Sequence, residues 1–517
     1  MKHASLRHDP SNLISGAWIP TPGNSLTTRN PARPAEVLWS AGVEPSHVHR
    51  AVAAAHDALP TWASWPREKR FDVLRRFQKI AAEHLDAATN LLRDEIGKPA
   101  WDAKGEAGLL GPKVDITLDE SATGALRRVS GFETPVAEGR IGRCWFRPHG
   151  VMAVLGPFNF PMHLPNGHIV PALAMGNTIV FKPSDKAAAS GQFLAELYHQ
   201  ALTEAGAPPG VVNLVQGGAD VASALVRHDD LDGILFTGSW PVGRRILEAN
   251  LDRPGRIAAL EMGGNNPAII MPDADLRQAA IECVRCAFIT SGQRCTCTRR
   301  VLVHRSVAGR FITALAKAAS NLLIGDPASP HPVFMGPVIS HAARDQILAA
   351  QSALAKAGGE VVVPMTPHDP STFGGSFLTP GVMRVPRFVP SDNPSAPGAD
   401  IEVFGPFLRI AEFDDLDDAI AQANATRFGL AASIFTKSQT AADRFLALAR
   451  AGCVNVNTGT AGASSKLPFG GLGLSGNHRP AGAFSLDYCA YPVAGMIESG
   501  AAALVSPGMR FEDAWLA

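Results

Sequence analysis

Apolar residues recur every three or four positions between Ser46 and Ala122, and charged residues occupy many of the positions between them. The stretches "VHRAVAAAHDALPTWAS" and "REKRFDVLRRFQKIAAEHL" show this spacing most clearly, and it predicts amphipathic helices. Before them the pattern is weaker. We expect the first residues, up to about position 20, to form a loose arm, with short strands around a turn at "GAWIP" and "EVLWSAG".

From Val151 the pattern changes to short apolar runs that alternate with helical stretches. The runs include "VMAVLGP", "TIVFKPS", "GILFTGS" and "PAIIM", and "GQFLAELYHQALTEAG" is one of the helical stretches. Continuous apolar runs separated by helices are typical of a parallel, doubly wound sheet. A second α/β region is expected after residue 271, with a strand at "RRVLVH" and a proline- and glycine-rich loop over 364–400. The stretch 139–150 predicts a strand-rich ribbon that can reach a neighbouring subunit.

Charge and composition narrow the class of protein. The 517 residues include 47 Lys and Arg and 47 Asp and Glu, so no large basic surface for nucleic acid is predicted. Charged residues make up 18% and apolar residues 46%, which is typical of a globular enzyme. No uninterrupted apolar run of about 20 residues predicts a membrane span. The N-terminal stretch also lacks the apolar centre of a signal peptide, so we expect a cytoplasmic protein.

The stretch "SGQRCTC" contains two cysteines, Cys295 and Cys297, whose role the local spacing leaves open. They could be a metal clip, a redox pair, a buried thiol, or a nucleophile with a neighbour. The chain has seven cysteines, an odd and sparse number, so reduced thiols are expected. Cys283 and Cys286 form a C-x-x-C upstream, but that segment predicts a helix, and no distal pair completes a four-ligand site. We expect no metal.

Two glycine-rich stretches resemble nucleotide-binding turns. "GLGLSG" at 471–476 matches G-x-G-x-x-G, but no predicted strand precedes it and no helix follows, so we interpret it as a turn near the active site or a subunit contact. In "GILFTGSWPVGRRI" an apolar strand ends in Gly238 and Ser239, and a helix is predicted from Gly243. Small residues there let phosphate oxygens approach backbone N–H groups and a helix N-terminus. An ordinary strand–turn–helix connection is the alternative.

Four further polar residues lie at predicted strand ends or in loops, where α/β proteins bind ligands. They are Asn159 in "GPFNFP", Lys182 in "FKPSD", Glu261 in "LEMGGNNP" and Glu402 before "VFGPF". Taken singly, each has an ordinary interpretation as a turn residue or a solvated side chain.

Together, these motifs resemble the aldehyde dehydrogenase superfamily. "GPFNFP", "FKPSD", "FTGSWPVG", "LEMGGNNP", "GQRC" and "EVFGPF" occur in the order of that family, and the resemblance covers roughly residues 13–498. "GQRCTCTRR" and "FGGLGLSGNHRP" are most similar to the branch that acts on N-succinylglutamate 5-semialdehyde in bacterial arginine catabolism. The resemblance implies oxidation of that semialdehyde, with NAD and water, to N-succinylglutamate. Another carboxylated semialdehyde is the alternative substrate.

The resemblance also implies catalytic roles. Cys295 would attack the aldehyde as a thiolate and form a thiohemiacetal. The Asn159 side-chain amide and the backbone N–H of Cys295 would stabilise the oxyanion. Hydride transfer to NAD would leave a thioester, and Glu261 would act as general base for the water that hydrolyses it.

A binding site for NAD follows from the same matches. Lys182 and Asp185 would hold the adenine-side ribose, and Glu402 would hold the nicotinamide ribose with Phe404 beside the ring. The pyrophosphate would lie on the run of Gly238, Ser239, Trp240, Pro241, Val242 and Gly243. Asp185 stands where the wider family usually has glutamate, but its carboxylate still favours ribose hydroxyls over a 2′-phosphate.

The implied substrate carries two carboxylates, so nearby cationic residues are candidates for binding it. Arg294 and the "NHR" stretch of Asn477, His478 and Arg479 are such candidates, because guanidinium groups bind carboxylates in a bidentate manner. Pairing of these arginines with acidic side chains of the chain itself is the alternative.

The implied fold is α/β and aldehyde dehydrogenase-like. It combines a Rossmann-type NAD-binding domain, an α/β catalytic domain and a small β oligomerisation part. We expect the first at 12–125 and 149–261, the second at 262–470 and the third at 126–148 and 482–497. Residues 500–517 extend beyond the resemblance and have no assigned role. The family implies a homodimer or a dimer of dimers.

Other classes of function compete with this interpretation. A thiol hydrolase would use Cys295 with a histidine, but none of the 16 histidines lies in a hydrolase signature. A CoA-acylating relative would not need water, and the presence of Glu261 argues against it. A non-catalytic relative would not be expected to keep Cys295, Glu261, Asn159 and Lys182 together.

Overall fold

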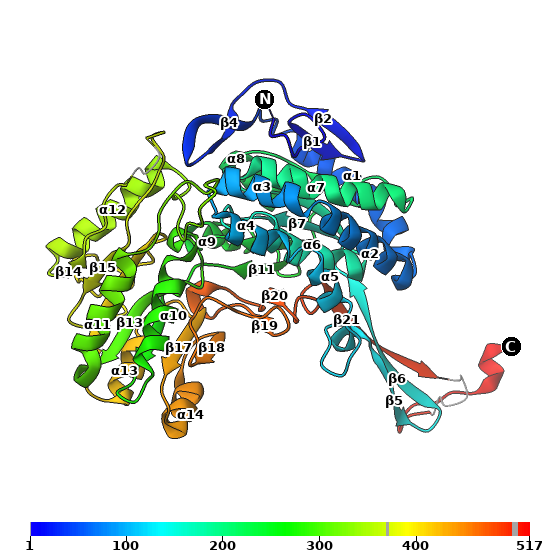
Figure 1. The fold of residues 1–517 in the computed structure, drawn as a ribbon. Helices are drawn as coiled ribbons and strands as arrows, with labels where there is room; N and C mark the ends of the chain where they lie inside the picture. Colours follow the sequence, from blue (N-terminus) through cyan, green and yellow to red (C-terminus); the bar gives the residue numbers. More distant parts are fainter. Residues whose placement is uncertain (1, 369–371, 499–504) are drawn as a thin grey trace.

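The computed structural model describes residues 2–368, 372–498 and 505–517 (Figure 1). Two seven-stranded sheets, each covered by helices, form the body, and a three-stranded ribbon projects from it. The predicted α/β fold is confirmed. The proposed domain limits stay a prediction, which the membership of the three sheets supports.

The first sheet has the strand order β11-β10-β7-β8-β9-β1-β2. Its strands are β1 (Ser11–Ile14), β2 (Ala17–Pro20), β7 (Val151–Leu155), β8 (Thr178–Lys182), β9 (Val212–Leu214), β10 (Gly233–Thr237) and β11 (Ile257–Glu261). The five strands from β7 to β11 run parallel. Successive strands extend from β7 in one direction through β8 and in the other through β10. The crevice above the ends of β7 and β10 is therefore the topological switch point, where ligands of such sheets bind.

The N-terminal segment is a correction to our expectation of a loose arm. β1 is buried along its whole length and pairs antiparallel with β9, with Leu13 opposite Leu214. Asn12 strengthens the attachment, because its Oδ1 accepts a hydrogen bond of 2.7 Å from the backbone N–H of Gln216. "SNLI" shows no alternation of polar and apolar positions, since both faces of the strand are covered.

The helices predicted between Ser46 and Ala122 are confirmed. Nine helices belong to the part of the chain up to β11: α1 (His47–Ser64), α2 (Arg67–Glu83), α3 (Leu85–Ile96), α4 (Ala100–Ala107), α5 (Pro112–Thr117), α6 (His163–Met175), α7 (Ala188–Glu204), α8 (Ala219–Arg227) and α9 (Trp240–Glu248). Buried side chains of α2, α3, α6 and α7 share one apolar core with one face of the sheet. Buried side chains of α1, α8 and α9 form a second core with the other face.

The second sheet has the order β14-β15-β16-β13-β12-β17-β18 and is parallel except for the β14–β15 pair. Its strands are β12 (Asn266–Ile270), β13 (Thr298–His304), β14 (Glu360–Val363), β15 (Gly381–Arg384), β16 (Phe407–Phe413), β17 (Ala431–Phe435) and β18 (Cys453–Val456). Helices α10 (Leu276–Phe288), α11 (Arg305–Ser320), α12 (His341–Lys356), α13 (Leu416–Ala423) and α14 (Gln439–Leu448) belong to it.

Two features of this region differ from what the local pattern indicates. The pattern groups "PAIIM" with the apolar runs of the first sheet, but β12 pairs with β13 and β17 of the second sheet and lies inside the catalytic domain predicted at 262–470. Periodicity identifies a buried strand but not the sheet that it joins. The predicted loop over 364–400 contains β15, a four-residue strand between Pro380 and Pro386 that is too short to show a pattern. Residues 369–371 of that loop lie outside the described residues.

The projecting ribbon is an antiparallel sheet of β5 (Phe132–Ala137), β6 (Arg140–Pro148) and β21 (Ala490–Glu498), with β6 in the centre (Figure 1). Two small sheets pair β3 (Leu26–Asn30) with β4 (Arg33–Ala41) and β19 (Pro468–Phe469) with β20 (Ala481–Gly482). Short 3-10 helices occupy Leu126–Val129, Ile289–Gly292 (η2), Gly473–Ser475 and Asp513–Leu516. No helix in the described ranges is both long and apolar enough to cross a membrane.

Candidate active site

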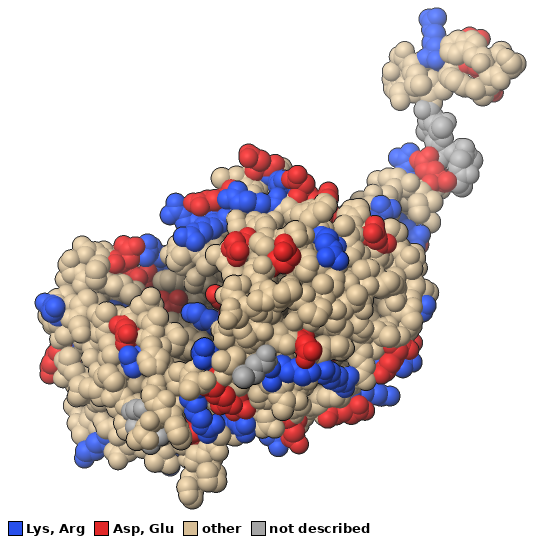
Figure 2. Space-filling view, turned by 90° about the horizontal axis from the view of Figure 1, so that it is seen from above, with Lys and Arg blue, Asp and Glu red and all other residues tan. Residues whose placement is uncertain are grey.

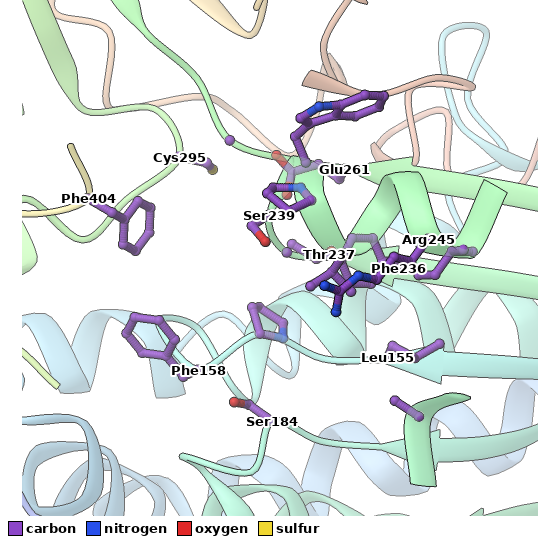
Figure 3. A pocket seen from close by; sticks show the side chains of 18 of the residues that line it. Leu155, Phe158, Ser184, Phe236, Thr237, Ser239, Arg245, Glu261, Cys295 and Phe404 are labelled. Atoms are coloured by element: carbon purple, nitrogen blue, oxygen red, sulfur yellow. The ribbon is translucent and has the colours of Figure 1, made fainter. Parts of the chain in front are cut away.

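A large cavity of about 1090 Å³ opens at the switch point of the first sheet and reaches the second. Lysines, arginines and acidic residues lie interspersed on the face shown in Figure 2. The lining includes Asn159, Lys182, Glu261, Cys295 and Glu402, five residues that the sequence motifs singled out. In Figure 3, Cys295 and Glu261 lie at one end, and the rings of Phe404 and Phe158 flank the same space. The fold therefore brings the predicted catalytic and cofactor residues into one cavity.

Cys295 lies between η2, which is a strained turn, and β13. Three consecutive residues, Thr290, Ser291 and Gly292, have φ values of 53°, 54° and 72°. Only glycine fits at the third position, because a Cβ there would lie 2.0 Å from the carbonyl oxygen of Gly405. Burial, and then the negative charges of Glu261 and Glu402, raise the pKa of the Cys295 thiol well above its usual range. The resting thiol is therefore protonated and needs a base before it can attack.

Glu261, the candidate for this base, is the last residue of β11 and is 1% exposed. Neither of its carboxylate oxygens accepts a hydrogen bond of good geometry within the described residues. Burial raises the pKa of Glu261 to about 8, the nearby Cys295 thiol opposes the rise, and the charge of Glu402 adds to it. A carboxyl group with a pKa near neutrality, next to a thiol and without a structural partner, is suited to accept and release protons.

Asn159 lies between β7 and α6 and is 5% exposed. Its side-chain Nδ2 donates a hydrogen bond of 2.9 Å to the main-chain carbonyl of Gln293, two residues before Cys295. The amide nitrogen carries a second hydrogen, which is available to a ligand in the cavity. Asn159 is thus tied to the turn that precedes Cys295.

The phosphate-type turn lies where the sequence predicted it, but its helix starts earlier. α9 begins at Trp240 and not at Gly243, with Ser239 as the N-cap residue and no side-chain cap. Pro241 has no N–H, and the N–H groups of Val242 and Gly243 both bond to the carbonyl of Ser239. The N–H groups of Ser239 and Trp240 are the donors that remain in this turn for a ligand.

Two glycines keep the turn close to its neighbours. A Cβ on Gly238 would lie 2.4 Å from the ring of Phe236, and one on Gly243 would lie 2.2 Å from the sulfur of Met262. The Gly238 N–H donates to the carbonyl of Glu261 at 3.0 Å, which fixes the turn to the strand end that carries the base.

Lys182 ends β8 inside the cavity and is 7% exposed. Its ammonium makes no hydrogen bond or ion pair within the described part of the chain. Burial lowers the pKa of Lys182 to about 8, and the carboxylates of Asp185 and Asp220 oppose this. Asp185 is exposed at the cavity rim, where its Oδ1 accepts a hydrogen bond of 3.3 Å from Ser184. A buried lysine without a partner is suited to a polar ligand.

Glu402 and Phe404 line the opposite side of the cavity. The Glu402 carboxylate accepts a hydrogen bond of 3.0 Å from the Gly264 N–H, and burial raises its pKa while Arg299 opposes the rise. The Phe404 ring makes an edge-on contact with Phe158, with ring centroids 6.0 Å apart.

The four candidate substrate residues do not line this cavity. Arg294 forms an ion pair of 2.6 Å with Asp102 of its own chain. The amide of Asn477 bonds to the backbone of β11, accepting from Leu260 and donating to Ala258. His478 is exposed, and Arg479 donates to the carbonyl of Gly471 at 3.1 Å. Arg294 therefore follows the alternative that the sequence left open, in which an arginine pairs with an acidic side chain of its own chain. Asn477 instead supports the strand that carries Glu261.

The remaining motifs pack around the site. Ser475, in "GLGLSG", donates its hydroxyl to the carbonyl of Gly263 at 2.6 Å and accepts the N–H of Met262 at its own carbonyl. The motif is therefore a turn beside Glu261 and not a nucleotide loop. Cys297 is fully buried, and Cys283 and Cys286 lie on α10. No group of three or more metal-ligating side chains comes together in the described residues.

Sequence reasoning missed a buried polar cluster behind the site. Lys98, Asp102 and Glu106 lie on or just before α4, and each is less than 5% exposed. The signal was present in "KPAWDAKGEAG", where two acidic residues four apart share the helix face of Ala103 and Ala107.

Comparison with known proteins agrees with this geometry. The sequence model of the aldehyde dehydrogenase family matches residues 18–492. An N-succinylglutamate 5-semialdehyde dehydrogenase of Burkholderia thailandensis is 41% identical over 506 residues, which cover 96% of this chain and 99% of the relative. An enzyme of the same name from Hahella chejuensis is 42% identical over 504 residues, with the same coverage.

Solved structures resemble the fold over nearly its whole length. PnpE in complex with nicotinamide adenine dinucleotide has a TM-score of 0.87 and 28% identity, and the match covers 97% of this chain and all of PnpE. An NADP-dependent enzyme of E. coli has a TM-score of 0.86 and 31% identity, with 95% and 98% covered. The chain belongs to the aldehyde dehydrogenase family.

Proposed function

We propose that the protein oxidises N-succinylglutamate 5-semialdehyde to N-succinylglutamate, with NAD as the hydride acceptor and water as the second substrate. The observation that carries the proposal is the single cavity shared by Cys295, Glu261 and Asn159 with the turn that begins α9. The names of the relatives that match 96% of the chain support the choice of semialdehyde. Other carboxylated semialdehydes remain the alternative substrates.

The residues present fit NAD. Gly238 and Gly243 have no room for a side chain, and the N-terminus of α9 has no side-chain cap, so the turn can accept phosphate oxygens. Lys182 offers an unpaired ammonium, and Asp185 a carboxylate, to ribose hydroxyls. The Asp185 carboxylate would repel a 2′-phosphate, which favours NAD over NADP. Glu402 and Phe404 would hold the nicotinamide side. When bound, NAD accepts the hydride.

The chain's own residues would carry the remaining chemistry. The Cys295 sulfur would bond to the aldehyde carbon as the thiol proton moves to Glu261, and the oxyanion would be held by Asn159 Nδ2 and the Cys295 N–H. Loss of hydride converts the thiohemiacetal to a thioester on Cys295. After Glu261 has released the thiol proton to solvent, its carboxylate would take a proton from water as the water oxygen bonds to the acyl carbon, and would pass that proton to the departing sulfur. The carbon–sulfur bond breaks, which releases the acid and restores the thiol.

A direct test compares kcat/KM with NAD for four semialdehydes, by NADH absorbance. The set is N-succinylglutamate, N-acetylglutamate, glutamate and succinate semialdehyde. We expect the succinylated compound to be preferred at least tenfold. Preference for another member would overturn the substrate, whereas no NADH formation with any of them would overturn the dehydrogenase itself.

The proposal also includes the oligomeric state and the cellular location of the protein. A homodimer or dimer of dimers is supported by the exposed apolar side chains of the projecting ribbon, among them Phe132, Ile141 and Met496. A cytoplasmic location is supported by the need for intracellular NAD.

A further inference from the structure

Helix α4 carries two buried carboxylates that do not line the cavity, Asp102 and Glu106. They lie four residues apart and so share one face of the helix. Asp102 is 4% exposed and Glu106 is 1% exposed. Buried carboxylates are costly unless they are paired and hydrogen-bonded. Apart from Lys98, their partners lie on the two segments that carry Cys295 and Asn159.

Asp102 holds the turn that precedes Cys295. Its Oδ1 accepts a hydrogen bond of 2.6 Å from Arg294 Nη2, and its Oδ2 accepts one of 2.6 Å from the Thr290 hydroxyl. Arg294 Nε also donates to the Thr290 hydroxyl oxygen at 2.7 Å, which closes a ring of three side chains. Thr290 has a φ of 53°, a left-handed conformation that persists only where its surroundings hold it.

Glu106 holds the segment that contains Asn159. Its Oε1 accepts hydrogen bonds of 3.1 Å from the backbone N–H groups of Met162 and His163, at the start of α6. Its Oε2 accepts a hydrogen bond of 2.5 Å from Lys98, which is fully buried. α6 has no side-chain cap from its own N-cap residue, so Glu106 provides the carboxylate that its N-terminus favours.

The two anchored segments also meet directly. The Phe160 ring, next to Asn159 in sequence, lies 3.4 Å from Lys98 Nζ and 4.8 Å from the Arg294 guanidinium carbon, both measured to the ring centroid. The Asn159 amide bonds to Gln293 on the other segment. These two contacts join the segment of Asn159 directly to the turn that precedes Cys295.

We propose that α4 sets the position of Cys295 against Asn159, with Asp102 as the positioning residue for the Cys295 turn and Arg294 as its partner. The inference rests on the proposed use of Cys295 as nucleophile. It assigns Arg294 to the support of the turn and not to the substrate. A displacement of about 1 Å in such a site can cost roughly 10²-fold in rate.

The test uses Asp102→Asn, which keeps the size of the side chain and an acceptor for Thr290 but loses the ion pair with Arg294. We expect single-turnover NADH formation from propanal to slow by about 10- to 10²-fold, while the Kd for NAD changes less than twofold. Alkylation of Cys295 by iodoacetamide, followed by mass spectrometry, should also slow because the thiol is displaced from Glu261.

Asp94→Asn is the matched control. Asp94 is 9% exposed, lies on the neighbouring α3 and pairs with Arg93 at 2.7 Å, without contact to the Cys295 turn. It should lower the melting temperature but leave both rates within twofold. Equal effects of Asp94→Asn and Asp102→Asn on the single-turnover rate would overturn the proposal.

Arg294→Met separates positioning from substrate binding and serves if Asp102→Asn fails to fold. Positioning predicts an equal loss of kcat with propanal and with the succinylated substrate, and partial recovery in Arg294→Lys. It also predicts that the Asp102→Asn, Arg294→Met double variant loses little more activity than either single variant.

A raised KM for the succinylated substrate alone, with normal turnover of propanal, would show that Arg294 binds substrate and would refute the inference. A wild-type protein that oxidises no aldehyde would instead overturn the proposed function on which the inference rests.

Discussion

The side-chain amide of Asn159 donates a hydrogen bond of 2.9 Å to the main-chain carbonyl of Gln293. This bond joins the segment that follows β7 in the first sheet to the turn that precedes β13 in the second. One amide hydrogen aligns the two segments, and the other is available for the oxyanion. The alignment of the two segments and the proposed stabilisation of the oxyanion therefore depend on the same side chain.

Substitution of Asn159 by alanine is expected to lower kcat by about 10²–10³-fold, because an oxyanion donor is lost. KM for a short aldehyde should change much less. Steady-state NADH formation from propanal measures both. Asn213→Ala is the control. Asn213 is fully buried and donates hydrogen bonds from its side-chain amide to backbone carbonyls, but it lies away from the cavity. It should lower the melting temperature and leave kcat nearly unchanged; similar kcat values for the two variants would contradict the role of Asn159.

The pKa of Glu261 predicts the pH dependence of hydrolysis. The carboxyl group must be ionised to act as a base, and its pKa is raised to about 8. The deacylation rate should therefore rise as pH increases from 6 to 9, with a midpoint near 8. Glu261→Gln should lower steady-state turnover by roughly 10²–10⁴-fold. A pH-independent rate over this range in the wild-type protein would argue against Glu261 as the base.

The same pKa predicts an effect on stability, with a defined sign. The folded-state pKa of Glu261 lies above the ordinary value of 4.5, so the folded state binds the proton more tightly. The contribution of this bound proton to the free energy of unfolding is fully present below pH 4.5 and is lost as pH rises to about 8. Glu261→Gln cannot ionise, so its melting temperature should exceed that of the wild type most at pH 8–9 and least near pH 4.5. Thermal unfolding across this range measures the difference; a constant difference would indicate that Glu261 is not buried as a neutral acid.

The Asp185 carboxylate is expected to discriminate between NAD and NADP. Asp185→Ser removes the charge that would repel a 2′-phosphate while keeping a small polar side chain. The ratio of kcat/KM for NAD over NADP should fall at least tenfold, mainly through KM. Asp392→Ser is a useful control, because Asp392 also lines the cavity but pairs with Arg427. An unchanged ratio in Asp185→Ser would mean that another group selects the cofactor.

The sequence predicted the parts of this molecule that local pattern determines. The parallel strands of the first sheet are short apolar runs, and Glu261, Lys182 and the Gly238 turn lie where such runs end. Assignment of Cys295 over Cys297 needed the family motifs, because the local spacing treated the two alike. The structure then separates them, since Cys295 lines the cavity and Cys297 is fully buried.

Other features depended on contacts that no local pattern records. β1 is a strand because β9 leaves an edge for it, and "PAIIM" joins the second sheet because β13 and β17 offer partners. Arg294 was a reasonable substrate ligand on chemistry alone. Its partner, Asp102, lies 192 residues away in sequence, so only the fold shows that the guanidinium is already paired.

The ribbon of β5, β6 and β21 predicts a subunit contact that can be broken. Phe132 is 65% exposed and Met496 is 68% exposed, and apolar side chains gathered on a projecting sheet indicate a protein–protein interface. The double substitution Phe132→Glu, Met496→Glu should convert the oligomer to monomers, as measured by light scattering after size exclusion.

Leu323→Glu is the control. It alters a side chain of comparable exposure, 64%, in the loop after α11 and should leave the assembly intact. A wild-type monomer would show that the ribbon forms no subunit contact, and an oligomer that survives both ribbon substitutions would place the contact elsewhere. The monomeric variant should still bind NAD, because none of the residues that line the cavity belongs to the ribbon.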